Sequence, residues 1–340
     1  MNGVAPFQIV IVATPGFNLA ASTSFLDPFR AANYLDGVRR FTWGIYGIQT
    51  GNCSEQLTAS NGLSVLAEPL SDAPEKPDLV IVSSSWTPEA YYGAPLDGAL
   101  RRWARFGAVV GGLDTGAFIL AAAGLLNGRR ATVHYEHTDA FIETFPKVTV
   151  TEDLLTLRGD RVTAAGGQAS SDLALHILNR VAGPALANAA ARYVFHDRLR
   201  PDGERQAPDH AEPLGADAPT AIRQAIKLME AHLEEVMSAP GIASAVGLSL
   251  RQLERLFQRY VGKPPQRYYT DIRLDRARGL VRQTQMSLKE ISLACGFASQ
   301  EHFSRAYRTR FGASARQDRK DGTTPFEYRA WPMHESGANR

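Results

Sequence analysis

A short stretch around Asp114 has the residue types and spacing of a catalytic turn. The sequence GGLDTGAFILAAAGLL, residues 111–126, continues a strand-like run that starts at Gly107 and opens directly into an Ala-rich helix. A sharp strand–turn–helix junction with glycines on both sides of the central residue is the geometry that lifts a nucleophilic Ser or Cys above a sheet. Here the residue at the centre of the turn is Asp114.

Three roles for Asp114 follow from chemistry. It can be a nucleophile that forms an ester intermediate, which would need a base such as His134. It can cap the helix expected over residues 116–124, because a helix N-terminus favours a carboxylate. It can also bind a cationic ligand together with aromatic side chains that follow the neighbouring predicted strand, since aromatic faces attract guanidinium and quaternary ammonium groups. The aromatic candidates are Trp86, Tyr91 and Tyr92. For these three, ordinary packing or a dimer contact is the alternative to ligand binding.

The elements that must position these residues alternate between strands and helices. Short β-rich runs, two of them almost continuously β-branched, alternate with helical stretches, which predicts an α/β domain with a mostly parallel sheet. Ligands in such domains bind at the carboxyl ends of the strands, where Asp114 is expected. The predicted strands are 7–13, 41–48, 77–85 and 106–114, with helices at 20–35, 96–106 and 171–183 and a hairpin within 148–167.

Charge divides the chain into two parts. The net charge is +2, but residues 221–320 carry 18 Lys and Arg against 9 Asp and Glu, whereas residues 1–220 have a net charge of −6. A basic block of this kind predicts a polyanionic partner for the C-terminal part. Residues 199–219, rich in Pro, Gly, Asp and Ala, are predicted to be a linker.

The basic block contains an internal repeat. Residues 242–262 and 291–312 align at many positions, and each copy reads as a helix, a Gly-containing turn and a second helix, which predicts two helix-turn-helix units. Capping boxes support this: Ser249 with Gln252, and Ser287 with Glu290. Residues 264–284 are long enough to be one connecting helix, so two units could enter major grooves about 34 Å apart. The alternative is a helical bundle with a solvated basic face.

These residues resemble the DNA-binding domain of AraC/XylS transcription regulators. The resemblance covers residues 220–319 and is carried by IASAVGLSLRQLERLFQRYVG, EISLACGFASQEHFSRAYRTRFG and SARQDR. The family usually has a Ser-Pro pair before the closing Arg, whereas this chain has Ser314-Ala315 with Arg319 following. We therefore expect the last turn to be held less rigidly.

The resemblance implies DNA contacts on exposed positions of the second helix of each copy. Arg can pair with guanine, Gln with adenine, and Glu can accept from cytosine. Arg255 and Arg305 occupy the same position in the two copies. For them, a structural role or a phosphate contact is the alternative to a base contact. The core positions Leu253, Leu256, Phe257, Phe303 and Tyr307 are assigned no contact. The implied base contacts are Arg251, Glu254, Arg255, Gln300, His302 and Arg305, and Ser249 and Ser299 are placed for phosphates.

The N-terminal part, residues 7–195, resembles the PfpI branch of the glutamine-amidotransferase-like superfamily, and its fusion to an AraC-type domain is the arrangement of the GlxA family of regulators. Catalytic members carry Cys at the turn and often a Glu after the first strand. Here Asp114 replaces the Cys, and PGFNLAA after the first strand contains no acid. The resemblance therefore implies a pocket that senses an effector, a small cationic amino acid or a betaine-like amine, at Asp114, His134, Trp86, Tyr91 and Tyr92. The alternative function is an active amidase or hydrolase that uses Asp114 and also binds DNA.

The remaining expectations concern domains, partners and location. We expect a sensor domain over 1–198, a linker over 199–219, the DNA-binding domain over 220–320 and a tail over 321–340. Expected partners are promoter half-sites in double-stranded DNA, RNA polymerase, the effector and a second copy of the chain; regulators of this family are usually activators. Cys53 and Cys295, too far apart in sequence for a metal motif, are predicted to be reduced thiols, and we expect no metal, no cofactor, no membrane partner and a cytoplasmic location.

Overall fold

The computed structural model describes residues 5–48, 55–206 and 218–320 and divides the chain into two compact units, with the division after Gln206. Cys53, residues 207–217 of the expected linker and the expected tail lie outside the described residues. The first unit is a layered α/β domain and the second consists of helices. The predicted fold class is therefore confirmed.

The first unit is built on an eight-stranded sheet with the strand order β3-β4-β2-β1-β5-β6-β10-β9. Neighbouring strands are parallel from β4 to β10, and the two outermost pairs, β3 with β4 and β9 with β10, are antiparallel. A separate parallel pair joins β7 and β8. The strands are β1 Phe7–Ala13, β2 Phe41–Gly47, β3 Glu55–Thr58, β4 Ser64–Pro69, β5 Leu79–Ser84, β6 Val109–Asp114, β7 Arg130–Ala131, β8 Thr149–Val150, β9 Leu155–Thr156 and β10 Arg161–Ala164.

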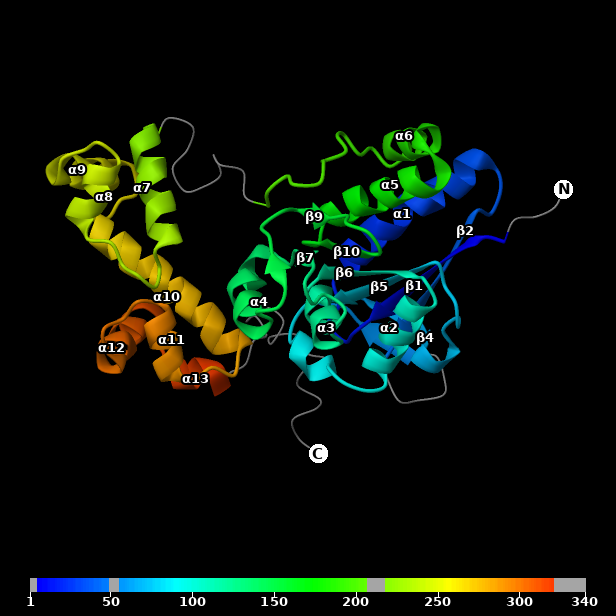
Figure 1. Cartoon of the computed structure of the whole chain (residues 1–340), viewed down its shortest axis with the longest axis horizontal. Coiled ribbons are helices and arrows are strands. Elements are labelled where there is room, and N and C mark those ends of the chain that lie inside the picture. The colour runs from blue at the N-terminus through cyan, green and yellow to red at the C-terminus, as the bar shows by residue number, and fades with distance from the viewer. Residues whose placement is uncertain (1–4, 49–54, 207–217, 321–340) are drawn as a thin grey trace. The chain divides into compact units, whose positions relative to one another are not determined.

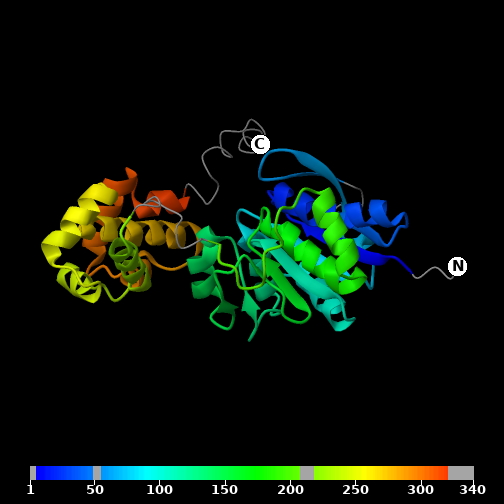
Figure 2. The ribbon, with the colours of Figure 1, turned by 90° about the horizontal axis from the view of Figure 1, so that it is seen from above.

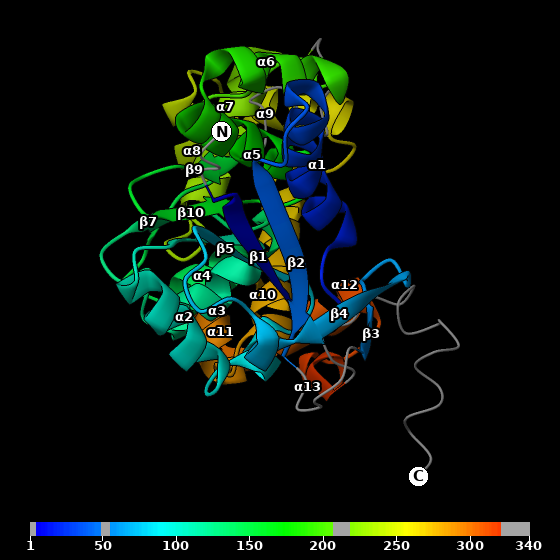
Figure 3. The ribbon, with the colours of Figure 1, turned by 90° about the vertical axis from the view of Figure 1, so that its right-hand side faces the viewer.

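Both faces of the central strands are buried, as their continuous apolar sequences predict. Ile9 and Ile11 of β1 pack in one core with α1, α5 and α6, whereas Val10 and Val12 pack in the opposite core with α2, α3 and α4. Figure 1 shows these two sets of helices on opposite sides of the sheet, and Figure 3 shows the same three layers from another side. The helices are α1 Leu19–Asp36, α2 Leu96–Arg105, α3 Gly116–Ala122, α4 Thr138–Thr144, α5 Ala169–Ala182 and α6 Pro184–Tyr193.

The four strands expected in the central sheet and the hairpin within 148–167 are present, as β1, β2, β5, β6 and the β9–β10 pair. The sequence did not predict β3, β4, β7 and β8. These strands are two to six residues long and have at most three apolar residues in a row, so hydrophobic periodicity gives little signal for them.

The first unit extends beyond the expected start of the linker at residue 199. The buried carboxylate of Asp172 accepts hydrogen bonds from the backbone N–H and the Nε of Arg200. The side chain of Gln206 donates to the backbone oxygens of Val133 and Asp153, at 2.7 and 3.2 Å. Residues 199–206 therefore belong to the surface of the first unit.

The second unit contains two helix-turn-helix pairs joined by one long helix. The core of the first pair includes Ile222, Ala225, Ile226 and Met229 of α7, whose spacing of three and four residues puts them on one face of the helix. The connecting helix α10 contributes to both cores, with Tyr269 in the first and Ala277, Leu280 and Val281 in the second. In Figure 2 it is the orange helix between the two pairs. The helices are α7 Thr220–Ala231, α8 Ala239–Ala245, α9 Leu250–Tyr260, α10 Pro265–Gln283, α11 Leu288–Ala294, α12 Gln300–Phe311 and α13 Ala315–Lys320.

The closing turn of the second unit differs from expectation. Asp318 of α13 is buried and accepts hydrogen bonds from the side chains of Arg278, Arg282 and Tyr307 at 2.8 Å each. Arg319 donates to the backbone oxygens of Val281 and Met286. The expectation of a loosely held last turn is therefore wrong, because these charged hydrogen bonds replace the missing proline constraint. None of the helices described is long and apolar enough to cross a membrane.

Candidate functional site

Asp114 is the last residue of β6 and has the strained backbone of the predicted turn. Its φ angle is +58°, a left-handed conformation that is uncommon outside glycine. The glycines around it are required by space: a Cβ on Gly116 would lie 2.1 Å from the carbonyl oxygen of Val82, and one on Gly112 would lie 2.6 Å from the backbone nitrogen of Ala117. The Gly-x-Asp-x-Gly pattern therefore lets α3 start directly against the sheet.

The carboxylate of Asp114 is buried and accepts hydrogen bonds from the side chains of Asn18 and Ser85. The Nδ2 of Asn18 donates to Asp114 Oδ2 at 2.7 Å, while the Oδ1 of Asn18 caps α1 by accepting from the N–H of Ala21. The hypothesis that Asp114 caps α3 is wrong: the N-cap is Thr115, which makes no side-chain capping bond, and its hydroxyl donates to the backbone oxygen of Ser85 instead.

Burial dominates the electrostatics of this site. It raises the pKa of Asp114 to about 6, against the opposing effects of the hydrogen bond from Asn18 and of nearby His134. Burial also lowers the pKa of His137 to about 3, so this imidazole is neutral near pH 7. Near neutral pH the carboxylate of Asp114 is therefore mostly ionised, in a site where a negative charge has lost most of its hydration.

The other predicted residues of this site lie in different surroundings. His134 interacts electrostatically with Asp114, and its Nδ1 accepts from the N–H of Glu136. The ring of Trp86 lies 6.5 Å from that of His137, and its buried Nε1 has no acceptor among the described residues. The hydroxyl of Tyr91 donates to the carbonyl of Pro15, whereas Tyr92 packs edge-on against Phe145 at 6.2 Å. The structure thus groups Asp114 with His134, and Trp86 with His137, and directs both tyrosines to other contacts.

Sequence reasoning missed Asn18 and His137. Asn18 lies in the segment PGFNLAA directly after β1, at the sheet edge where Asp114 was expected, so its position was a usable signal. His137 follows His134 by three residues, but nothing in the sequence indicates that its imidazole is buried. That burial depends on packing against Phe118, whose ring lies 6.2 Å away.

The second unit presents the predicted DNA-contacting residues on α9 and α12, which we call the reading helices. Their inward positions Leu253, Phe257, Phe303 and Tyr307 are buried, as expected. Both predicted capping boxes are present, so the expected starts of α9 and α11 are confirmed. Every predicted contact residue is exposed: Ser249, Arg251, Glu254, Arg255, Ser299, Gln300, His302 and Arg305.

The exposed residues of the reading helices differ in whether they form ion pairs or hydrogen bonds within the protein. Among the described residues, neither Arg251 nor Arg255 has an ion-pair partner within 4 Å. Both serines cap their helices: the hydroxyl of Ser299 accepts from the N–H of His302 at 3.2 Å, and that of Ser249 accepts from the N–H of Gln252 and donates to the Oε1 of Gln252. The guanidinium groups of α9 are therefore available to an external acceptor.

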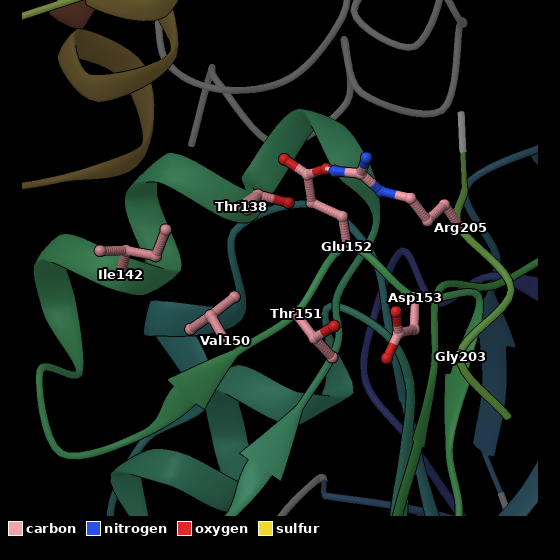
Figure 4. Close-up of a pocket in the computed structure, with 8 residues that line it drawn as sticks. All are labelled: Thr138, Ile142, Val150, Thr151, Glu152, Asp153, Gly203 and Arg205. Carbon is pink, nitrogen blue, oxygen red and sulfur yellow. Dashed lines mark hydrogen bonds and ion pairs between the residues drawn. The ribbon is translucent and has the colours of Figure 1, made fainter. Parts of the chain in front are cut away.

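A cavity of about 450 Å³ adjoins the segment where the first unit ends. Figure 4 shows Glu152 and Arg205 on its wall with their side chains pointing toward each other, and they form an ion pair. Asp153 on the same wall pairs with Arg130 at 2.7 Å. The cavity is lined mostly by polar and charged residues, with two apolar side chains: Thr138, Ile142, Val150, Thr151, Glu152, Asp153, Gly203 and Arg205.

Comparison with known proteins identifies the family. A family model described as a helix-turn-helix domain matches residues 242–321. The transcriptional regulator CdhR of Pseudomonas aeruginosa is 39% identical over 305 residues, which cover 90% of this chain and 89% of CdhR. The regulator GlxA of Rhizobium meliloti is 33% identical over 305 residues, covering 89% of this chain and 93% of GlxA. The chain belongs to the GlxA-type regulators of the AraC family.

Solved structures agree with this assignment for the N-terminal fold. An AraC family transcriptional regulator from Pseudomonas putida is 26% identical, with a TM-score of 0.50, and covers 56% of this chain and 100% of that chain. A ThiJ/PfpI family protein from Pseudomonas syringae has the same TM-score at 19% identity and covers 67% of this chain and 88% of that chain. The GlxA-type regulator described here is thus a DNA-binding transcription regulator whose first unit has a PfpI-like fold.

Proposed function

We propose that this GlxA-type regulator reads two successive major-groove segments of promoter DNA, one with α9 and one with α12. The observation that carries the proposal is the pairing of two separate helix-turn-helix cores through the single helix α10. A helix of 19 residues is about 28 Å long, which is close to the 34 Å of one DNA turn. The two reading helices can therefore meet the same face of the duplex.

Within each segment, we assign base contacts to exposed side chains near the start of the reading helix. Arg251 can donate two hydrogen bonds to guanine, and Gln300 can pair with adenine. Ser249 and Ser299, at the helix N-termini, are placed for phosphates. The remaining candidate base contacts are Glu254, Arg255, His302 and Arg305.

Binding assays on promoter DNA with single substitutions test these assignments. Arg251→Ala and Gln300→Ala should each weaken specific binding by about 1–3 kcal/mol and relax the preference for one base position. Lys227→Ala removes a cation from α7, outside both helix-turn-helix pairs, and is the matched control. Base preferences that remain unchanged in both variants would contradict the assignment.

We further propose that the site around Asp114 binds a small cationic effector, a basic amino acid or a betaine-like amine. A buried carboxylate that is ionised near pH 7 is stabilised by a cation that enters beside it. Trp86 directly follows Ser85, whose side chain hydrogen-bonds to Asp114, and its ring is an aromatic face of the kind that attracts such cations. His134 is the adjacent polar group, and Tyr91 and Tyr92 complete the set that the sequence suggests.

Calorimetric titration of the whole protein with arginine, lysine and glycine betaine tests the effector class, with glutamate as the anionic control. One of the cations should bind, and Asp114→Asn should weaken its binding by about tenfold or more. Asn keeps the size of the side chain and can still accept the hydrogen bond from Asn18. Heat from glutamate alone, or an affinity that the substitution leaves unchanged, would contradict a cationic effector.

We infer that the Asp114 site does not hydrolyse esters or amides. The carboxylate already accepts from Asn18, and the Nδ1 of His134 is engaged with the backbone of its own turn, so the pair lacks the arrangement that activates a nucleophile and a water. Turnover of a chromogenic ester should be the same for wild type and Asp114→Asn. Turnover that the substitution abolishes would support the hydrolase alternative.

The family supports four further parts of the proposal. A regulator that reads repeated half-sites is expected to act as a homodimer, to contact RNA polymerase and to work in the cytoplasm as an activator. Sedimentation of the protein with and without a promoter fragment measures the number of copies bound. One copy per promoter would contradict the dimer.

A further inference from the structure

A second cavity in the first unit lies near the opposite end of strand β6 from Asp114. Asp114 ends β6, whereas Arg161, which lines the cavity, pairs with Val110 near the beginning of that strand. The cavity has a volume of about 630 Å³, within the range of small-molecule sites. Its wall comes from α2, from the segment after α3 and from β10: Gly98, Arg101, Ala104, Arg105, Leu125 and Arg161.

Arg161 has an unused hydrogen-bond donor at this cavity. Its side chain is only 8% exposed, and its Nη1 donates to the backbone oxygen of Asp160 and lies 2.9 Å from the Asp160 carboxylate. Its Nε is buried and has no acceptor within the described part of the chain. A buried donor without a partner costs about 1–3 kcal/mol, more when the group is charged, so an acceptor from outside the protein would stabilise it.

The charges around the cavity leave an excess of arginine. Arg105 is exposed and has no ion-pair partner among the described residues. Arg101 donates its Nε to the backbone oxygen of Ala123 and lies 3.6 Å from Asp97. Asp160 is shared, because it also pairs with Arg129 at 2.6 Å. Three arginines therefore line the cavity, Arg101, Arg105 and Arg161, and none of its lining residues is acidic.

We propose that this cavity binds a small organic anion that carries at least two carboxylate or phosphate oxygens. Guanidinium groups match such oxygens with two parallel hydrogen bonds, and Arg161 offers its Nε for one of them. Arg101 and Arg105, one turn apart on α2, supply the second charged contact. Ala104 and Leu125 give the wall an apolar part that suits the carbon skeleton of a metabolite. The site is separate from the proposed effector site and does not depend on it.

Calorimetric titration of the whole protein with citrate and with pyrophosphate tests the proposal and distinguishes carboxylate from phosphate ligands. Binding of either should weaken by about tenfold or more in Arg105→Ala, because a charge-assisted hydrogen bond is lost. Arg102→Ala is the matched control, since Arg102 is exposed on the same helix but does not line the cavity. Arg161→Lys keeps the charge but removes the Nε donor and should weaken binding as well.

Such anions could also bind to the basic second unit instead of the cavity. Weaker binding in Arg251→Ala would identify that case. Under the proposal, Arg251→Ala and Arg102→Ala both bind like wild type, whereas Arg105→Ala does not. Because Arg105 is exposed, its substitution leaves the fold intact, so the test does not rest on Arg161→Lys alone. No binding of either anion by wild type would overturn the proposal, as would equal affinities for Arg105→Ala and Arg102→Ala.

Discussion

At the scale of single residues, Asp114 shows how a scaffold known from catalysis can carry a different group. The turn keeps its glycines and its strained backbone, but the central side chain is a carboxylate held by Asn18. The cost of burying this charge appears as a pKa raised to about 6. A site that destabilises its own charge when empty favours a cationic ligand.

Substituting Asp114 tests this cost directly. Because burial raises its pKa from 3.8 to about 6, the ionised form destabilises the folded state above pH 6. Asp114→Asn should therefore raise the free energy of unfolding at pH 7, by up to about 3 kcal/mol. The gain should shrink as the pH falls through 6 and vanish below about pH 4, where the carboxyl group is protonated in both states. Chemical denaturation at several pH values measures it, and a gain that does not depend on pH would contradict the assigned pKa.

At the scale of elements, the two helix-turn-helix pairs use equivalent glycines in unequal surroundings. Gly247 and Gly296 both have left-handed φ angles, +70° and +66°, so each turn favours a residue without Cβ. The space around Gly247 is open, whereas a Cβ on Gly296 would lie 2.6 Å from the backbone oxygen of Glu234. The second turn therefore packs closely against another segment and the first does not.

This difference predicts unequal effects of the same substitution. Gly247→Ala should destabilise the protein by about 1–2 kcal/mol, the cost of the left-handed backbone alone. Gly296→Ala should cost clearly more, because the backbone near Glu234 must also move. Thermal unfolding of the two variants, with wild type as the reference, measures the difference. Equal losses would show that the close contact at Gly296 relaxes freely.

The elements also show what sequence could predict and what it could not. The repeat, the connecting helix α10 and the central strands follow from apolar spacing and capping residues, because these signals are local. The hydrogen bond between Asn18 and Asp114 joins segments about 100 residues apart, and the burial of His137 depends on tertiary packing. No local sequence pattern indicates either feature. The closing turn was misjudged because the three donors to Asp318 come from two other helices.

In the whole molecule, the segment 199–206 is the last described part of the first unit before the chain leads to the DNA-binding unit. Gln206 donates to Val133, next to His134, so the segment is bonded to the loop that carries part of the proposed effector site. Gln206→Ala should release this segment and speed its cleavage by a protease in limited digestion. Arg205→Ala is the control, because the exposed ion pair of Arg205 with Glu152 contributes little. Equal cleavage rates in the two variants would contradict this role of Gln206.

If one chain binds two DNA segments on one face of the duplex, the affinity must depend on the spacing between those segments. The measurement is the affinity for a promoter site with five base pairs inserted between the segments protected by α9 and α12. The reference is an insertion of one full turn of DNA, which leaves both segments on the same face of the duplex. Because α10 joins the reading helices without a break, the first insertion should reduce specific binding to the level of a site that lacks one segment. Affinity that is unchanged by the first insertion would show that one chain does not bind the two segments together.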